Sequence, residues 1–110
     1  MAEGKTALAS QVITAAEMLS YQEGSVVSRT LIDKKPGTIT LFAFSEGQGL
    51  SEHTAPYDAF MQVIEGEAEV TISGSPYVVK EGQFIIMPAD EPHSVRAAKQ
   101  FKMLLVMIRA

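Results

Sequence analysis

The stretch AFMQVIEGEAEVTIS, residues 59–73, consists of two apolar segments that are joined at Gly66. Its first half places Ala59, Met61 and Val63 at every second position, which is the spacing of one face of a β-strand. Gly66 can adopt the positive φ that a tight turn between two strands requires. The stretch therefore predicts a β-hairpin. Similar apolar segments lie on both sides of it in the chain, so its β-strand pattern indicates the fold class of the whole domain.

Further strands are predicted before and after this hairpin. Segments rich in β-branched and aromatic residues recur about every 8–12 residues, and turns that contain glycine or proline separate them. They are SVVSRTLID (25–33), TITLFAF (38–44), PYVVK (76–80), FIIM (84–87), HSVRA (93–97) and FKMLLVMI (101–108). No crossover helix separates them, so we predict an all-β protein, and a barrel in particular.

The most helix-like stretch precedes the strands. In QVITAAEMLSYQ the apolar residues recur at near-helical spacing, and Thr14 followed by Glu17 has the form of a capping box. We predict a short helix that begins at Thr14 and ends at Gly24. Residues 1–24 are thus expected to form an N-terminal segment, and residues 25–110 a single barrel domain.

The last predicted strand, FKMLLVMI, is apolar on both faces. In a barrel one face of this strand packs into the core, so the other face also needs a cover. The N-terminal segment and a second copy of the chain are the two candidates for that cover. We expect a homodimer in which sheets of two copies pack together.

Composition and charge exclude several classes of function. The chain of 110 residues has a net charge of −4, which provides no basic surface for nucleic acid or for an anionic membrane. It has no cysteine, and therefore no disulfide, thiolate metal ligand or cysteine nucleophile. No apolar run has the length of a signal-peptide core or of a membrane span, which needs about 18 residues. We therefore predict a soluble, cytoplasmic protein whose partner is a small molecule.

The only two histidines of the chain stand in two motifs of regular spacing. Gly47 is followed by five residues and then by His53, and a glycine closes the next predicted strand. Gly82 is followed by QFIIM, then by Pro88 and, five residues later, by His93. Over most of the predicted barrel this pair of motifs resembles the cupin family, specifically the small single-domain cupins of the type-2 conserved-barrel kind. The resemblance implies a double-stranded β-helix, also called a jelly-roll barrel, and small members of the family are commonly dimers.

The resemblance also implies a metal site, from which this sequence departs. The family's first motif has His-x-His and a third ligand further on, whereas the positions two and six residues after His53 are here Ala55 and Ala59. In the second motif, Asp90 replaces a glycine and Ala97 replaces an asparagine. Of the four usual ligands only the two histidines remain. Two imidazoles hold a first-row ion weakly, so a divalent Zn, Ni, Fe or Mn ion is expected to bind weakly if it binds at all.

We predict a ligand pocket at the mouth of the barrel, in the volume that the missing ligands leave. Its lining is expected to combine two imidazoles with apolar side chains, as ligand pockets usually do. Core packing explains the methionines more simply, and an exposed strand position explains Arg29 more simply, than contact with a ligand. The predicted ligand-binding residues are His53, His93, Met61, Phe42, Met87 and Arg29, and the predicted metal ligands are His53 and His93.

Three functions remain open at this point. The favoured one is a barrel whose degenerate two-histidine pocket binds a small polar or anionic metabolite. The second is a metal-dependent enzyme, such as a dioxygenase or an isomerase, in which His53 and His93 hold the ion and water or substrate completes its shell. The third is a structural or interaction module with a vestigial pocket. The fold does not decide among them, because such barrels host many chemistries, and the sequence names no catalytic residue.

Overall fold

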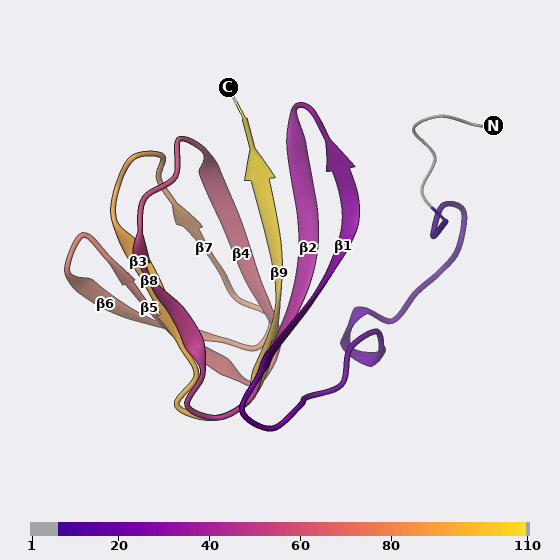
Figure 1. The fold of residues 1–110 in the computed structure, drawn as a ribbon, viewed down its shortest axis with the longest axis horizontal. Helices are drawn as coiled ribbons and strands as arrows, with labels where there is room; N and C mark the ends of the chain where they lie inside the picture. Colours follow the sequence, from indigo (N-terminus) through magenta and orange to yellow (C-terminus); the bar gives the residue numbers. More distant parts are fainter. Residues whose placement is uncertain (1–6, 110) are drawn as a thin grey trace.

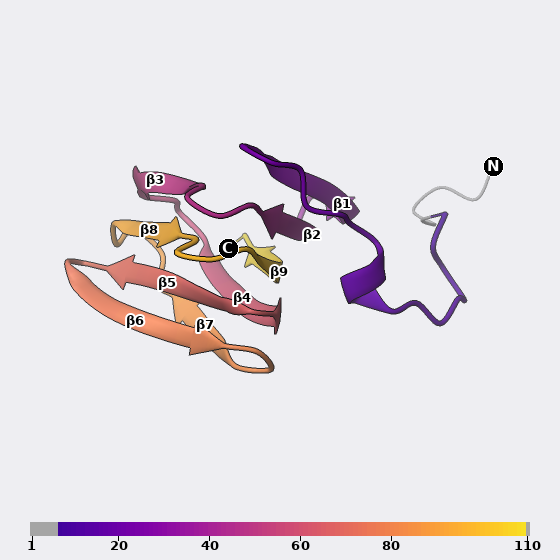
Figure 2. The same cartoon turned by 90° about the horizontal axis from the view of Figure 1, so that it is seen from below.

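The structure, a computed structural model, describes residues 7–109, so residues 1–6 of the predicted N-terminal segment lie outside the described residues. Antiparallel strands form two sheets that converge at the bottom of Figure 1 and diverge at its top, and Figure 2 shows the same two layers from below. One sheet has the strand order β1-β2-β9-β4-β7, with β1 (Val26–Lys34), β2 (Gly37–Phe44), β9 (Phe101–Ile108), β4 (Asp58–Glu65) and β7 (Phe84–Met87). The other has the order β3-β8-β5-β6, with β3 (Gly49–His53), β8 (His93–Arg96), β5 (Glu67–Ile72) and β6 (Ser75–Lys80). This is the all-β jelly-roll barrel that was predicted.

The two strands of the stretch 59–73 are present, but the predicted hairpin between them is wrong. β4 pairs with β7 and β9, whereas β5 pairs with β6 and β8, so the chain changes sheets at Gly66. Both strands turn their apolar residues toward the core from opposite sides, which two strands of one hairpin cannot do. Gly66 permits this corner because it has a φ of 79° and because an added Cβ would lie 2.8 Å from the carbonyl oxygen of Gln100.

The other predicted strands agree with the structure to within a residue or so at their ends, and FIIM and FKMLLVMI have the predicted bounds. The sequence pattern does not predict β3, because four of its five residues are exposed and no apolar alternation marks it. β3 nevertheless pairs with β8, and it carries His53 to the mouth of the barrel. The strand that matters most for the site is therefore the least visible in the sequence.

The core lies between the two sheets. Phe44 and Phe101 stack in it at 4.6 Å between ring centroids, and Met61, Met103 and Val70 are fully buried beside them. Burying each of these large side chains contributes about 1.5–3 kcal/mol to folding. The aromatic end of the core thus holds the sheets together where they converge.

The predicted N-terminal helix is only a 3-10 turn, η1 (Ala15–Glu17). Thr14 stands at its N-cap, but its side chain makes no capping hydrogen bond, so the predicted capping box does not form. One turn gains too few hydrogen bonds to offset the cost of helix nucleation, so packing on the sheet decides the conformation instead. No helix within residues 7–109 is long and apolar enough to cross a membrane.

Lys102 anchors the N-terminal segment to the barrel. Its buried ammonium donates a hydrogen bond to the carbonyl oxygen of Ala16, lies 3.7 Å from a carboxylate oxygen of Glu65, and stacks 4.9 Å from the ring centroid of Tyr21. The Tyr21 hydroxyl donates a hydrogen bond to the same carboxylate. Burial, and then the bond and the charge of Glu65, raise the pKa of Tyr21 well above its usual value. The segment is therefore fixed near residues 16–21.

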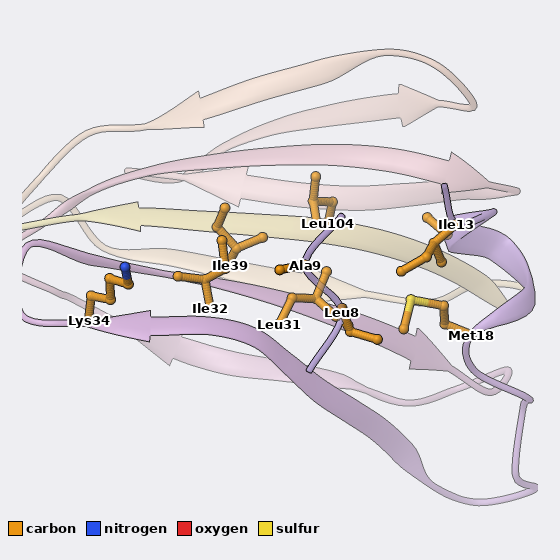
Figure 3. A pocket seen from close by; sticks show the side chains of 10 residues that line it. Leu8, Ala9, Ile13, Met18, Leu31, Ile32, Lys34, Ile39 and Leu104 are labelled. Atoms are coloured by element: carbon orange, nitrogen blue, oxygen red, sulfur yellow. The ribbon is translucent and has the colours of Figure 1, made fainter. Parts of the chain in front are cut away.

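The N-terminal segment covers only part of the outer apolar face of the five-stranded sheet. Between the segment and the sheet lies an apolar cavity of about 710 Å³ (Figure 3). Val12 is fully exposed, and Ile13 is partly so, although it lines the cavity. Of the two predicted covers for the last strand, the N-terminal segment is thus present but incomplete. The cavity is lined by Leu8, Ala9, Ile13, Ala15, Met18, Leu31, Ile32, Lys34, Ile39 and Leu104.

Candidate functional site

His53 and His93 meet on neighbouring strands of the four-stranded sheet. They are direct partners in the register of β3 and β8, and their rings lie edge to face with 4.4 Å between centroids. His93 is 5% exposed, whereas His53 is exposed. The two imidazoles therefore converge, with His93 inside the barrel and His53 at its rim.

Backbone carbonyl groups fix the orientation of both rings. Nδ1 of His53 lies 2.7 Å from the carbonyl oxygen of Ser51, and Nδ1 of His93 lies 3.1 Å from that of Glu91. A carbonyl oxygen only accepts hydrogen bonds, so Nδ1 carries the proton in each ring and Nε2 of the neutral ring keeps its lone pair. Among residues 7–109, no group forms a hydrogen bond with Nε2 of either ring. Histidines that bind metals or ligands are oriented by the same kind of contact.

The two rings border a small cavity between the sheets. Its volume is about 40 Å³, and its wall is apolar apart from the imidazoles. Ala55 and Ala59, the two positions without a metal ligand, both face it. The lining consists of Leu50, His53, Ala55, Ala59, Met87, His93, Val95, Met103, Leu105 and Met107.

The methionines on either side of Ala59 keep the cavity small. It is 3% exposed and stands between Met87 on β7 and Met107 on β9, its partners in the two adjacent strands. The long side chains of both methionines line the cavity. The large pocket that two lost ligands were expected to leave is therefore mostly filled with thioether side chains.

The loops beside the cavity are held together by hydrogen bonds. The amide of Asp90 donates to the carbonyl oxygen of Ala55 at 2.8 Å, and the amide of Ala89 donates to a carboxylate oxygen of Asp58 at 3.0 Å. Asp58 therefore closes a loop and does not supply the missing ligand. Asp90 has a φ of 66°, a conformation that suits the glycine of the family motif and that aspartate adopts more readily than most residues.

The other predicted site residues lie elsewhere. Met87 lines the cavity, but Met61 is packed deeper in the core, and Phe42 stacks on Phe44 without reaching the cavity wall. Arg29 is exposed on β1, so it supplies no charge to this site. Ala55 follows the end of β3, so it shares a side with His53 through the loop and not through strand alternation.

Several lining residues were not predicted from the sequence. Met103, Leu105 and Met107 are alternate residues of β9, and Leu50 and Val95 come from β3 and β8. Alternation along FKMLLVMI puts the first three on one face, but the sequence does not say which face points toward the histidines. The pairing of β9 with β4 provides that information.

A zinc-type site with three or four nitrogen, oxygen or thiolate ligands does not fit this set of donors. Within residues 7–109, no group of three or more histidine, cysteine, aspartate or glutamate side chains is placed to hold a metal ion. Two imidazoles remain on one side, and methyl and thioether groups take the other positions. Structural and catalytic zinc sites usually have at least three nitrogen, oxygen or thiolate donors from the protein.

Comparison with known proteins agrees with this architecture. The family profile described as the cupin domain matches residues 40–109, which include both histidine motifs. The chain belongs to the cupin family. The family assignment gives the barrel and the position of the site, but the ligand depends on the residues that line the cavity.

The solved structure of one protein is similar over the whole length of this chain. It is a conserved protein of unknown function, SPY1581 from Streptococcus pyogenes, with a TM-score of 0.92 and 34% identity; the match covers 100% of this chain and 96% of that one. A cupin 2 conserved-barrel protein from Leptotrichia buccalis has a TM-score of 0.83 and 39% identity, over 86% of this cupin and 46% of that chain.

A curated relative is similar over a shorter stretch. The polyketide synthase CurC of Streptomyces cyaneus is 33% identical over 61 residues, which are 54% of this cupin and 40% of that protein. The chain therefore spans less than half the length of the curated relative that it matches.

Proposed function

We propose that this cupin binds a small polar or anionic ligand through Nε2 of His53 and Nε2 of His93. The observation that carries the proposal is that both rings use Nδ1 on backbone carbonyls, that Nε2 of neither ring has a hydrogen-bond partner within residues 7–109, and that both residues line one cavity. A neutral Nε2 accepts a hydrogen bond from a ligand, and a protonated one donates to an anion. The apolar wall strengthens either interaction because it excludes water.

The size of the cavity limits what can enter it. Pockets for drug-sized molecules measure about 300–1,000 Å³, whereas this cavity measures about 40 Å³. Only the polar end of a small molecule fits inside, where it meets His93. The remainder would lie beyond His53, which is exposed at the rim.

A divalent metal ion is a weaker candidate for this site. Two imidazoles leave a zinc, nickel, iron or manganese ion with most of its shell to be filled by water. The apolar wall and the small volume leave little room for that water. The donor set therefore favours the binding of a metabolite over metal-dependent catalysis at this site.

Small carboxylates provide a direct test. We expect acetate, glycolate or pyruvate to bind the native protein in ligand-observed NMR, and His93→Ala to weaken that binding by about tenfold or more, since one hydrogen bond to a charged group contributes about 1.5–3 kcal/mol. His53→Ala should weaken it too. Arg29→Ala is the control, because Arg29 is exposed on β1.

The control also separates two accounts of anion binding. Equal weakening by Arg29→Ala and by His93→Ala would contradict the imidazole site. The absence of any carboxylate binding to the native protein would contradict the proposal for anions. Circular dichroism should show that each variant is folded.

A further inference from the structure

Three methionines share the cavity with the two histidines. Met87, Met103 and Met107 all line it, and Met87 and Met103 are at most 3% exposed. Their thioether groups do not stabilise a bound anion, because methionine sulfur donates no hydrogen bond and carries no positive charge. Core filling accounts for a buried methionine in general, but here three methionines line the one cavity that both histidines also line.

The methionines and the histidines come from opposite sheets. Met87 and Met107 lie on β7 and β9 of the five-stranded sheet, on either side of Ala59. His53 and His93 lie on β3 and β8 of the four-stranded sheet. All four residues border one cavity, so methionine and histidine side chains line it from opposite sheets.

This combination of donors suits a soft metal ion. Thioether and imidazole ligands select Cu(I), whereas hard divalent ions prefer oxygen ligands and retain bound water. A monovalent ion also costs less to transfer into an apolar cavity, since the solvation energy of an ion rises with the square of its charge. A volume of about 40 Å³ holds one ion without a water shell more easily than it holds a hydrated one.

We propose that the cavity is a Cu(I) site, formed by Nε2 of His53 and His93 together with the thioethers of Met87 and Met107. The inference rests on the free Nε2 atoms of the proposed function and adds a second class of ligand that competes for them. The substitution of two ligand positions by Ala55 and Ala59 then changes the kind of metal that the barrel accepts.

Anaerobic titration with Cu(I), in competition with a chromophoric chelator such as bicinchoninate, tests the proposal. We expect native protein to bind Cu(I) at least about a hundredfold more tightly than Zn(II), and Met87→Leu with Met107→Leu to weaken Cu(I) binding by about tenfold or more while leaving Zn(II) binding unchanged. Met61→Leu is the matched control, because Met61 is fully buried in the same barrel but does not line the cavity. Leucine for methionine conserves volume and costs less than about 1.5 kcal/mol, so the variants should fold.

X-ray absorption of the native copper complex provides a readout that needs no substitution. We expect sulfur scatterers beside the imidazoles, and fewer of them in the Met87→Leu and Met107→Leu variant. Equal affinity for Zn(II) and Cu(I), or a copper shell without sulfur, would overturn the copper site. Neither result affects carboxylate binding and its loss in His93→Ala, so failure of this inference is distinguishable from failure of the proposed function.

Discussion

The double substitution Ala55→His with Ala59→Glu is expected to raise the affinity of the protein for zinc or nickel by about a hundredfold or more. Each of the two added ligands needs to contribute only about 1.4 kcal/mol to reach this increase. Both alanines face the cavity that the two imidazoles border. Three imidazoles and a carboxylate on one cavity form a set that divalent first-row ions prefer. Isothermal titration of the native protein and of the double variant measures the difference.

The main risk for this variant is overpacking. Ala59 is 3% exposed between Met87 and Met107, and the cavity beside it measures only about 40 Å³. A larger side chain there costs about 1–3 kcal/mol if its neighbours cannot move. Adding Met107→Ala provides room for the glutamate, so a triple variant keeps the test decisive if the double variant is unstable.

A matched control separates the cavity from a general effect of new ligands. Ser28→His with Thr30→Glu adds the same two side chains to exposed positions of β1, and it should leave metal affinity unchanged. If native protein already binds zinc as tightly as the cavity variant, a further ligand completes its site and the degenerate-site account is wrong. If the β1 control gains as much affinity as the cavity variant, the register of the two alanines is wrong.

The protein is expected to be a dimer, with twice the 11.9 kDa mass of the chain, at micromolar concentration. The reason is the outer face of the five-stranded sheet, where Ile39, Val106, Phe60 and Ile86 pair in one row across β2, β9, β4 and β7. Phe84 stacks on Phe60 in the same area, at 4.7 Å between ring centroids. A continuous apolar row of this kind is typical of a protein interface, and a two-fold dimer would bury it.

Light scattering or analytical ultracentrifugation measures the mass. Ile86→Lys should shift the protein toward the monomer, because it places a charge at the end of the apolar row. Val78→Lys is a matched control: Val78 is also 55% exposed, but it lies on β6 of the other sheet. A native mass near that of one chain would contradict the dimer, and equal dissociation by both variants would contradict this choice of face.

Most strands were predictable because turns that contain glycine or proline separate segments rich in β-branched and apolar residues, but the pairing of the strands was not predictable. Residues 59–73 alternate on either side of Gly66, but the same pattern serves a hairpin and a corner between two sheets. Only the partners supplied by β7, β8 and β9 distinguish the two. The prediction of a short N-terminal helix was wrong for a different reason: contacts of Lys102 with Ala16 and Tyr21 determine the path of that segment.

The candidate site was predictable in part. The spacing of the two motifs, which resembles that of the cupin family, identified His53 and His93. The roles of Met103 and Met107 depend on which face of β9 points inward, and the tautomers depend on the carbonyls of Ser51 and Glu91. Neither feature leaves a signal in the local sequence.

The central claim is that His53 and His93 both present a free Nε2 to one cavity. Long-range proton–nitrogen NMR of the histidine rings tests it directly, because it reports which ring nitrogen carries the proton. We predict that both rings carry the proton on Nδ1, and that both Nε2 resonances shift together when acetate or Cu(I) is added. A proton on Nε2 of either ring, or a ligand that shifts one ring and leaves the other unchanged, would contradict the account.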